Sequence, residues 1–294
     1  MDGAINDSAA AATRRAEETK DAASGRQGLG QRRFGAVNWF GLWTLYKKEV
    51  RRFMKVVFQT VFAPVISTTL FLIVFMQAFG RAGTFVNGTP YIEFLAPGLI
   101  MLAILTNSFQ NSASSLVIGK VQGSIVDMLM APLSPSELAV AFVAGAATRG
   151  LIVGMATAAT AAVFMAFSAT PMSVSHVWAA AYFGGSAALM FAMFGVVAGV
   201  WADKFDEMAM ITNFVITPLT FLSGTFYAIS GLPEPFLSLS AFNPVFYLID
   251  GFRYGLTGVA EAPLMIGAGV TLALNVALAA VCYGLLKSGY KLKS

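Results

Sequence analysis

Three carboxylates lie within five residues in the segment ADKFDE, at Asp203, Asp206 and Glu207. Carboxylates in such a group suggest a Mg²⁺–diphosphate site of a membrane-embedded transferase, but that chemistry needs a second acidic cluster facing the same cavity. No second cluster lies between the apolar segments. A solvated turn is therefore the favoured interpretation, and a lipid-modifying transferase remains an alternative.

Nucleotide-binding chemistry is absent from the sequence. No G-x-x-x-x-G-K-[ST] motif occurs, because Gly119-Lys120 lacks both the upstream glycine and the following hydroxyl residue. We expect no cofactor in this chain, and any ATP that drives it must be hydrolysed by another polypeptide.

Isolated ionisable residues give weaker indications. His176 is the only histidine and has no second ligand nearby, so we expect no metal site. Arg149 interrupts an apolar segment, whereas ion-coupled transport needs several ionisable groups at membrane depth. Arg149 either extends to the interface or bonds backbone carbonyls, or it has a gating or substrate role.

The composition is that of a polytopic membrane protein. The 294 residues are 57% hydrophobic and only 12% charged, and the apolar residues form runs long enough to cross roughly 30 Å of hydrocarbon. Eleven of the nineteen Lys and Arg residues precede Val56, which indicates membrane topology rather than nucleic-acid binding. The single cysteine, Cys282, excludes an intrachain disulfide.

Residues 1–35 are polar and small, which predicts a disordered cytoplasmic tail or a short helix within it. Residues 36–55 predict an amphipathic helix on the inner membrane surface, with aromatic residues in the headgroup layer and cations toward anionic lipid. An irregular basic cluster beside the membrane is the alternative. The interface residues are Trp39, Trp43, Lys47, Lys48, Arg51 and Arg52.

Residues 56–290 form the predicted transmembrane domain, an all-α unit of six spans. The expected spans are about Val56–Phe79, Phe94–Ile118, Leu138–Phe167, Val177–Trp201, Met208–Tyr227 and Pro263–Leu286. The second span is unusually polar, and its Asn107, Gln110 and Asn111 are expected to line a pathway or to hold helices together.

The apolar segment 228–262 is not expected to be a seventh span. Asn243-Pro244 interrupts it, and Asp250 and Arg253 would cost several kcal/mol each deep in the bilayer. An even number of spans also keeps both Lys/Arg-rich ends in the cytoplasm. We predict a partly inserted external hairpin of two short helices, in which Asp250 and Arg253 pair for a few tenths of a kcal/mol.

With this topology the amphipathic segment Gly119–Glu137 is cytoplasmic. Ile125, Met128 and Leu129 share one helical face, and Leu133 continues it. The segment either lies on the bilayer or docks to a partner protein. Asp127 favours the partner, since anionic lipid repels a carboxylate.

The quoted residues now resemble a known family. DMLMAPLSPSE is similar to the cytoplasmic coupling helix of ABC-2-type transporter permeases, and PLTFLSGTFYAISGLP followed by NPVFYLIDGFRYG resembles the last third of that family. The basic helix before the first span resembles its interface helix. The resemblance covers about residues 37–290 and is nearest to the drug and lipo-oligosaccharide exporters.

The resemblance implies a bacterial inner-membrane exporter that works as a pair of permeases, with a homodimer expected, and binds two copies of a cytoplasmic ABC ATPase that hold Mg-ATP. Its substrate would be amphipathic, lipid-linked or drug-like. A non-transporting scaffold is the remaining alternative. The coupling residues would be Ile125, Asp127, Met128, Leu129, Met130, Pro132 and Leu133, and the external re-entrant residues Asn243, Pro244, Asp250 and Arg253.

Overall fold

The computed structural model describes residues 37–79, 85–86, 88–167, 172–234 and 236–291. The chain divides into residues Met1–Asn38 and Trp39–Ser294, and every helix considered below belongs to the second unit. The predicted tail 1–35 lies outside the described residues.

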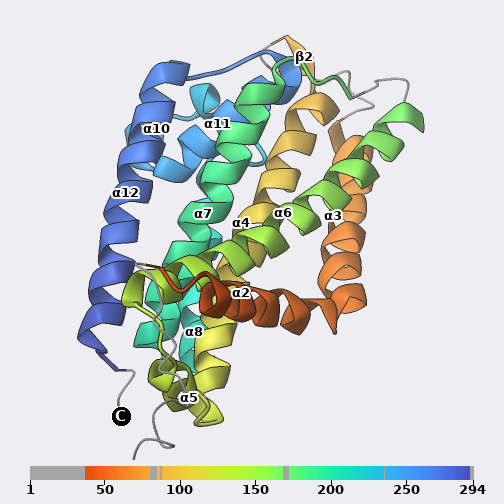
Figure 1. The fold of residues 1–294 in the computed structure, drawn as a ribbon. Helices are drawn as coiled ribbons and strands as arrows, with labels where there is room; N and C mark the ends of the chain where they lie inside the picture. The colour runs from red at the N-terminus through yellow and green to blue at the C-terminus, as the bar shows by residue number, and fades with distance from the viewer. Residues whose placement is uncertain (1–36, 80–84, 87, 168–171, 235, 292–294) are drawn as a thin grey trace, which may run out of the picture. The chain divides into compact units, whose positions relative to one another are not determined.

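Five helices of the described part are long and apolar enough to cross a membrane (Figure 1). They are α3 (Val57–Phe79), α4 (Tyr91–Val121), α6 (Pro135–Phe167), α7 (Val177–Trp201) and α12 (Leu264–Ser288). The chain is thus a polytopic all-α membrane protein, apart from a two-stranded ribbon, β1 (Phe85–Val86) and β2 (Thr89–Pro90).

Helices α4 and α7 form the centre of the bundle. In each, 78% of the most apolar stretch is buried, against 11% in α3 and α12. Close contact between α4 and α7 depends on Gly195, where an added Cβ would overlap Ser112 Oγ and the Phe109 carbonyl oxygen. The exposed face of α3 is apolar every fourth residue, at Phe58, Phe62, Ile66 and Leu70, as expected of a helix against hydrocarbon.

The expected fifth span, 208–227, is not one continuous α-helix. It consists of α8 (Phe205–Ile211), the π-helical turn η2 (Thr212–Ile216) and α9 (Thr217–Phe221), and residues 222–227 are not helical. At about 1.5 Å per residue the helical part is about 25 Å long. The chain nevertheless runs from Asp203, beside Lys120 at the end of α4, to Phe226, whose carbonyl accepts the Tyr91 hydroxyl at the start of α4.

The segment 228–262 contains η3 (Ile229–Gly231), α10 (Phe236–Phe242) and α11 (Pro244–Thr257). Asn243 caps α11, because its Oδ1 accepts the Val245 N–H at 3.0 Å, and Pro244 occupies the first helical position. The break that separates α10 from α11 is therefore the Asn-Pro pair.

Two further helices, α2 and α5, are not part of the bundle of long helices. Helix α2 (Trp39–Met54) runs across them in Figure 1, and α5 (Ile125–Met130) lies at the end where the C-terminal end of α12 also lies. Lys120 and Lys291 both bond Asp203, which ties the ends of α4, α7 and α12 together there.

Candidate functional site: a polar pocket and the surface of α5

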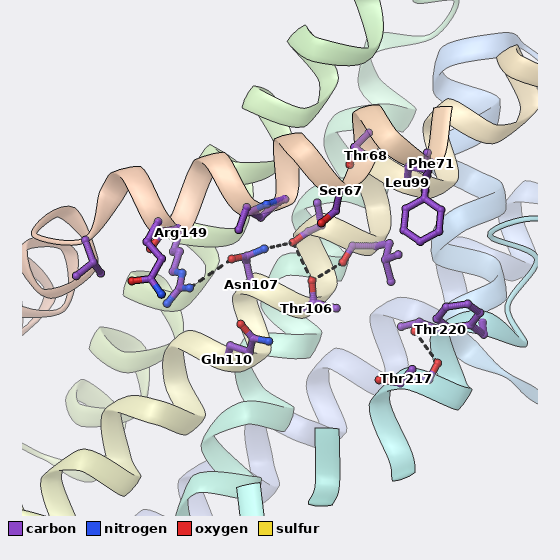
Figure 2. Close-up of a pocket in the computed structure, with 18 residues that line it drawn as sticks. Ser67, Thr68, Phe71, Leu99, Thr106, Asn107, Gln110, Arg149, Thr217 and Thr220 are labelled. Atoms are coloured by element: carbon purple, nitrogen blue, oxygen red, sulfur yellow. Dashed lines mark hydrogen bonds between the residues drawn. The ribbon is translucent and has the colours of Figure 1, made fainter. Parts of the chain in front are cut away.

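A pocket of about 660 Å³ lies between α3, α4, α6 and α9 (Figure 2). Asn107 and Gln110 of α4 line it, as does Arg149 of α6, whereas Asn111 does not. The remaining lining includes hydroxyl residues from α3, α4 and α9. These are Thr60, Ser67, Thr68, Thr106, Thr217 and Thr220.

The polar residues of α4 differ in what their side chains contact. Ser112 donates to the Ala192 carbonyl of α7 at 2.7 Å, so it joins two helices. Asn107 and Gln110 face the pocket. Asn111 is fully buried behind them, where it accepts bonds from two arginines. Ser112 thus holds two helices together, and the role of Asn107, Gln110 and Asn111 in a pathway stays a prediction.

Arg149 turns toward α4 rather than toward lipid. Its terminal nitrogens lie 3.4 Å from Asn107 Oδ1 and 3.4 Å from Asn111 Oδ1, and Figure 2 shows the side chain directed at Asn107. Its Nε is buried without a hydrogen-bond partner. Arg149 forms no ion pair with any residue of the described ranges.

One cation of α2, Arg52, does not point toward lipid as expected. Trp39, Trp43, Lys47, Lys48 and Arg51 are exposed. Arg52 instead turns inward, where it bonds Glu49 at 3.2 Å and the Asn111 carbonyl at 2.7 Å. Buried acceptors on α4 hold it there, which side-chain periodicity along α2 did not predict.

Sequence reasoning missed Glu49 entirely. This carboxylate is 1% exposed, pairs with Arg52 and accepts the Ser115 hydroxyl at 2.9 Å. One signal was available, because Glu49 is the only acidic residue in a basic helix. A lone carboxylate among cations, three residues before Arg52, predicts a local ion pair.

The amphipathic stripe of α5 packs onto its own chain. Ile125 is 7% exposed and contacts a core cluster that includes Leu45 of α2 and Leu116 of α4, and Met128, Leu129 and Leu133 pack partly against it. The surface available to a partner consists instead of Val126, Asp127 and Met130, the last 79% exposed, together with exposed Pro132.

The loop that leads from α5 into α6 forms a reciprocal helix cap. Ser134 N–H donates to Glu137 Oε2 at 2.7 Å, and Glu137 N–H donates to Ser134 Oγ at 3.3 Å. This is the capping box that S-P-S-E predicts, with Pro135 at the first helical position. It fixes the direction in which α6 leaves the α5 surface.

The expected pair Asp250–Arg253 is present, with Arg253 Nη1 4.0 Å from Asp250 Oδ1, and both residues are buried, at 2% and 3% exposure. Asp250 accepts the backbone N–H groups of Glu261 and Ala262 at 2.9 Å each. Arg253 donates to the Gly224 carbonyl at 2.7 Å and lies 3.7 Å from the centre of the Phe94 ring. A value of a few tenths of a kcal/mol holds for exposed pairs and does not carry over to a buried one.

In the acidic segment ADKFDE, Asp203 forms ion pairs with two lysines. Asp203 pairs with Lys120 and Lys291 at 3.1 Å each, and these hydrogen bonds hold the pKa of its carboxyl below the ordinary value. Among the described residues no group of His, Cys, Asp and Glu is arranged to hold a metal ion. His176 stacks on Tyr254 with ring centres 4.5 Å apart. These contacts lend no support to the transferase alternative.

Comparison with known proteins decides the family. The model of the ABC-2 type transporter family matches residues 41–257. The chain belongs to the ABC-2 type transporter family. The inner membrane transport permease YadH of Escherichia coli K12 is 36% identical over 257 residues, which cover 87% of this chain and 98% of YadH. Nodulation protein J of Rhizobium leguminosarum bv. viciae is 26% identical, over 79% of this chain and 88% of its own length.

The residues matched by the family model include the features described above. Residues 41–257 of this ABC-2 type protein include α5, the pocket and the α10–α11 hairpin, so all three lie inside the family domain.

Proposed function

We propose that this chain is the permease subunit of an ATP-driven exporter of the inner membrane, with ATP hydrolysed by a separate ABC ATPase. The main support is the division of α5 into an anchored face and an exposed one. Ile125 is held in the core, while Val126, Asp127 and Met130 are presented at one end of the bundle. The similarity to an inner membrane transport permease supports the location and the transport role.

The proposed membrane topology is argued from the end of the bundle that holds α5. We assign the α5 surface and the end of α12 to the cytoplasm, because Lys287 and Lys291 lie at that end and cytoplasmic segments are rich in Lys and Arg. Helices α8, η2 and α9 together are the fifth of six spans, and α10 and α11 are the external re-entrant hairpin. Helix α2 lies on the inner surface, with Trp39 and Trp43 in the headgroup layer.

The proposed partner arrangement is the one that the resemblance to ABC-2-type permeases implies. Two ATPase subunits bind Mg-ATP and dock one on each α5 surface of a permease homodimer. The pocket beside Asn107, Gln110 and Arg149 belongs to the pathway of an amphipathic, lipid-linked or drug-like substrate. Gln110 is exposed in the single chain, which suits a pathway that a second permease completes.

Co-purification with the cognate ATPase tests this function. The tagged chain is co-expressed with the ATPase, and the complex is reconstituted in proteoliposomes. We expect a stable complex, ATP turnover that depends on the permease, and ATP-dependent movement of an amphiphilic dye. Transport without a second polypeptide would refute the proposal, as would an ATPase that neither binds nor responds to the chain.

A further inference from the structure

The pocket carries its charged residue, Arg149, at one end, and the lining of the other end combines apolar and hydroxyl side chains. Along α4 its lining runs from Gln110 and Asn107 to Leu102 and Leu99. Figure 2 shows Arg149 at one end of the labelled side chains and Phe71 with Leu99 at the opposite end. The lining of α3 extends from Gln59 to Phe71, about 18 Å at about 1.5 Å per residue. An elongated amphiphile fits such a pocket.

The polar end carries an unmatched positive charge. Glu49 is the buried carboxylate of this cluster, and it is paired with Arg52. Among the described residues the hydrogen bonds of Arg149 go to the neutral amides of Asn107 and Asn111, each at 3.4 Å, and Arg52 is a further positive charge beside it. A partly buried charge without a counter-ion is costly, and an anion within reach would reduce that cost.

The cluster also has more hydrogen-bond donors than acceptors. Arg149 Nε and Asn111 Nδ2 are both buried without partners among the described residues. Asn111 Oδ1 already accepts from two arginines. A cationic or donor-rich ligand would add to this excess, whereas a carboxylate or phosphate oxygen would reduce it.

Access to the pocket is from the outer face of α3. Gln59, Ala63 and Ser67 line the pocket and are exposed, so a ligand reaches Arg149 from beside the bundle. The apolar face of the same helix, at Phe62 and Ile66, is the surface suited to hydrocarbon. The opening of the pocket thus adjoins the apolar exposed side of α3.

We propose that this pocket binds an amphiphile with an anionic head group, of the carboxylate or phosphate class. The head group pairs with Arg149 beside Asn107, and the apolar chain lies toward Leu99 and Phe71. This inference names the substrate class of the pocket and rests on the proposed transport function for its role in export.

Photolabelling of the full chain tests the head-group preference. The purified chain in phosphatidylcholine nanodiscs is labelled with dodecyl phosphate that carries a diazirine on its alkyl chain. Unlabelled dodecyl phosphate, dodecyltrimethylammonium and inorganic phosphate serve as competitors. We expect labelled peptides from α3 and α4, and competition by dodecyl phosphate that is at least about tenfold stronger than by the cationic amphiphile.

Variants locate the head group. Arg149→Gln is expected to weaken dodecyl phosphate competition about tenfold or more, and Arg149→Lys to retain most of it. Arg51→Gln removes one exposed arginine of α2 and is the charge-matched control that leaves competition unchanged. Ala63→Phe fills the pocket while leaving Arg149 intact, and it is expected to abolish specific labelling.

Three results would overturn the inference. These are equal competition by the anionic and cationic amphiphiles, an Arg149→Gln variant that labels like the parent chain, and inorganic phosphate that competes as well as dodecyl phosphate. Any of them, in a chain that still assembles with its ATPase, would leave the proposed function standing. Failure of ATPase assembly with intact dodecyl phosphate binding would refute the function instead.

Discussion

Arg52 of α2 and Arg149 of α6 both donate to the same atom, Oδ1 of Asn111, at 3.0 and 3.4 Å. Two like charges share one neutral acceptor, which is stable only where other groups offset the repulsion. Glu49 offsets the charge of Arg52 by forming an ion pair with it. Asn111 therefore connects the helix at the bundle's edge with the arginine that lines the pocket, and this relation underlies the inference about the ligand.

The buried pair Glu49–Arg52 is expected to stabilise the attachment of α2 to α4. Glu49→Ala leaves Arg52 and Arg149 without a carboxylate, and the cost is about 2–3 kcal/mol, since Arg52 keeps some exposure to solvent. Thermal unfolding in detergent measures it. The double variant Glu49→Ala/Arg52→Ala should recover part of the loss, and Arg51→Ala should be nearly neutral. Equal stability of Glu49→Ala and the parent chain would show that the pair contributes nothing.

The exposed and anchored faces of α5 predict opposite phenotypes. Val126→Asp and Met130→Asp change only the outward surface, so they should reduce ATPase co-purification while the melting temperature stays unchanged. Ile125→Ala removes buried side-chain volume and should cost about 2–4 kcal/mol of stability. If the outward variants bind the ATPase normally, the docking surface lies elsewhere.

The bounds of the long helices could be predicted from the sequence. Helix Val177–Trp201 matches the expected span, and α3, α4, α6 and α12 begin and end within three residues of prediction. Apolar runs determine such helices directly. The stripe Ile125, Met128, Leu129 was also recognised, but periodicity alone does not tell whether a stripe faces a partner or the chain's own core.

Contacts between distant segments were beyond sequence reasoning. The inward turn of Arg52 depends on acceptors 59 residues away, and burial of Arg253 depends on Phe94, 159 residues away. The π-helical turn at Thr212–Ile216 lies in an apolar run that hydropathy cannot distinguish from a plain helix. Asn107 and Gln110 were chosen for polarity alone, and Arg149 completes their site from another helix.

The carboxyl of Asp203 should make stability depend on pH in one direction. Its pKa is lowered by bonds from Lys120 and Lys291, so its contribution is present above the ordinary value of about 3.9 and is lost as pH falls through the lower folded value. Asp203→Asn should therefore lower the melting temperature at pH 7, and the difference should shrink below about pH 4.

Asp206 provides the control for this prediction, because it is exposed and forms no ion pair within the described ranges. Asp206→Asn should lower the melting temperature at pH 7 less than Asp203→Asn does. A melting-temperature difference for Asp203→Asn that persists undiminished at pH 3 would contradict the ion-pair account. Loss of all activity in the double variant, with the fold intact, would revive the transferase alternative.

Contact between α4 and α7 gives the sharpest stability test, because two glycines of α7 differ only in their surroundings. An added Cβ at Gly195 would overlap Ser112 Oγ and the Phe109 carbonyl oxygen, whereas nothing lies within 4 Å of one at Gly185. Both changes gain the same helix propensity, up to about 1 kcal/mol. Gly195→Ala should nevertheless destabilise the chain by about 1–3 kcal/mol, since the helices must separate, and Gly185→Ala should be neutral or stabilising. Thermal unfolding of the two variants side by side measures the difference, and equal midpoints would mean that α4 and α7 do not pack at this distance.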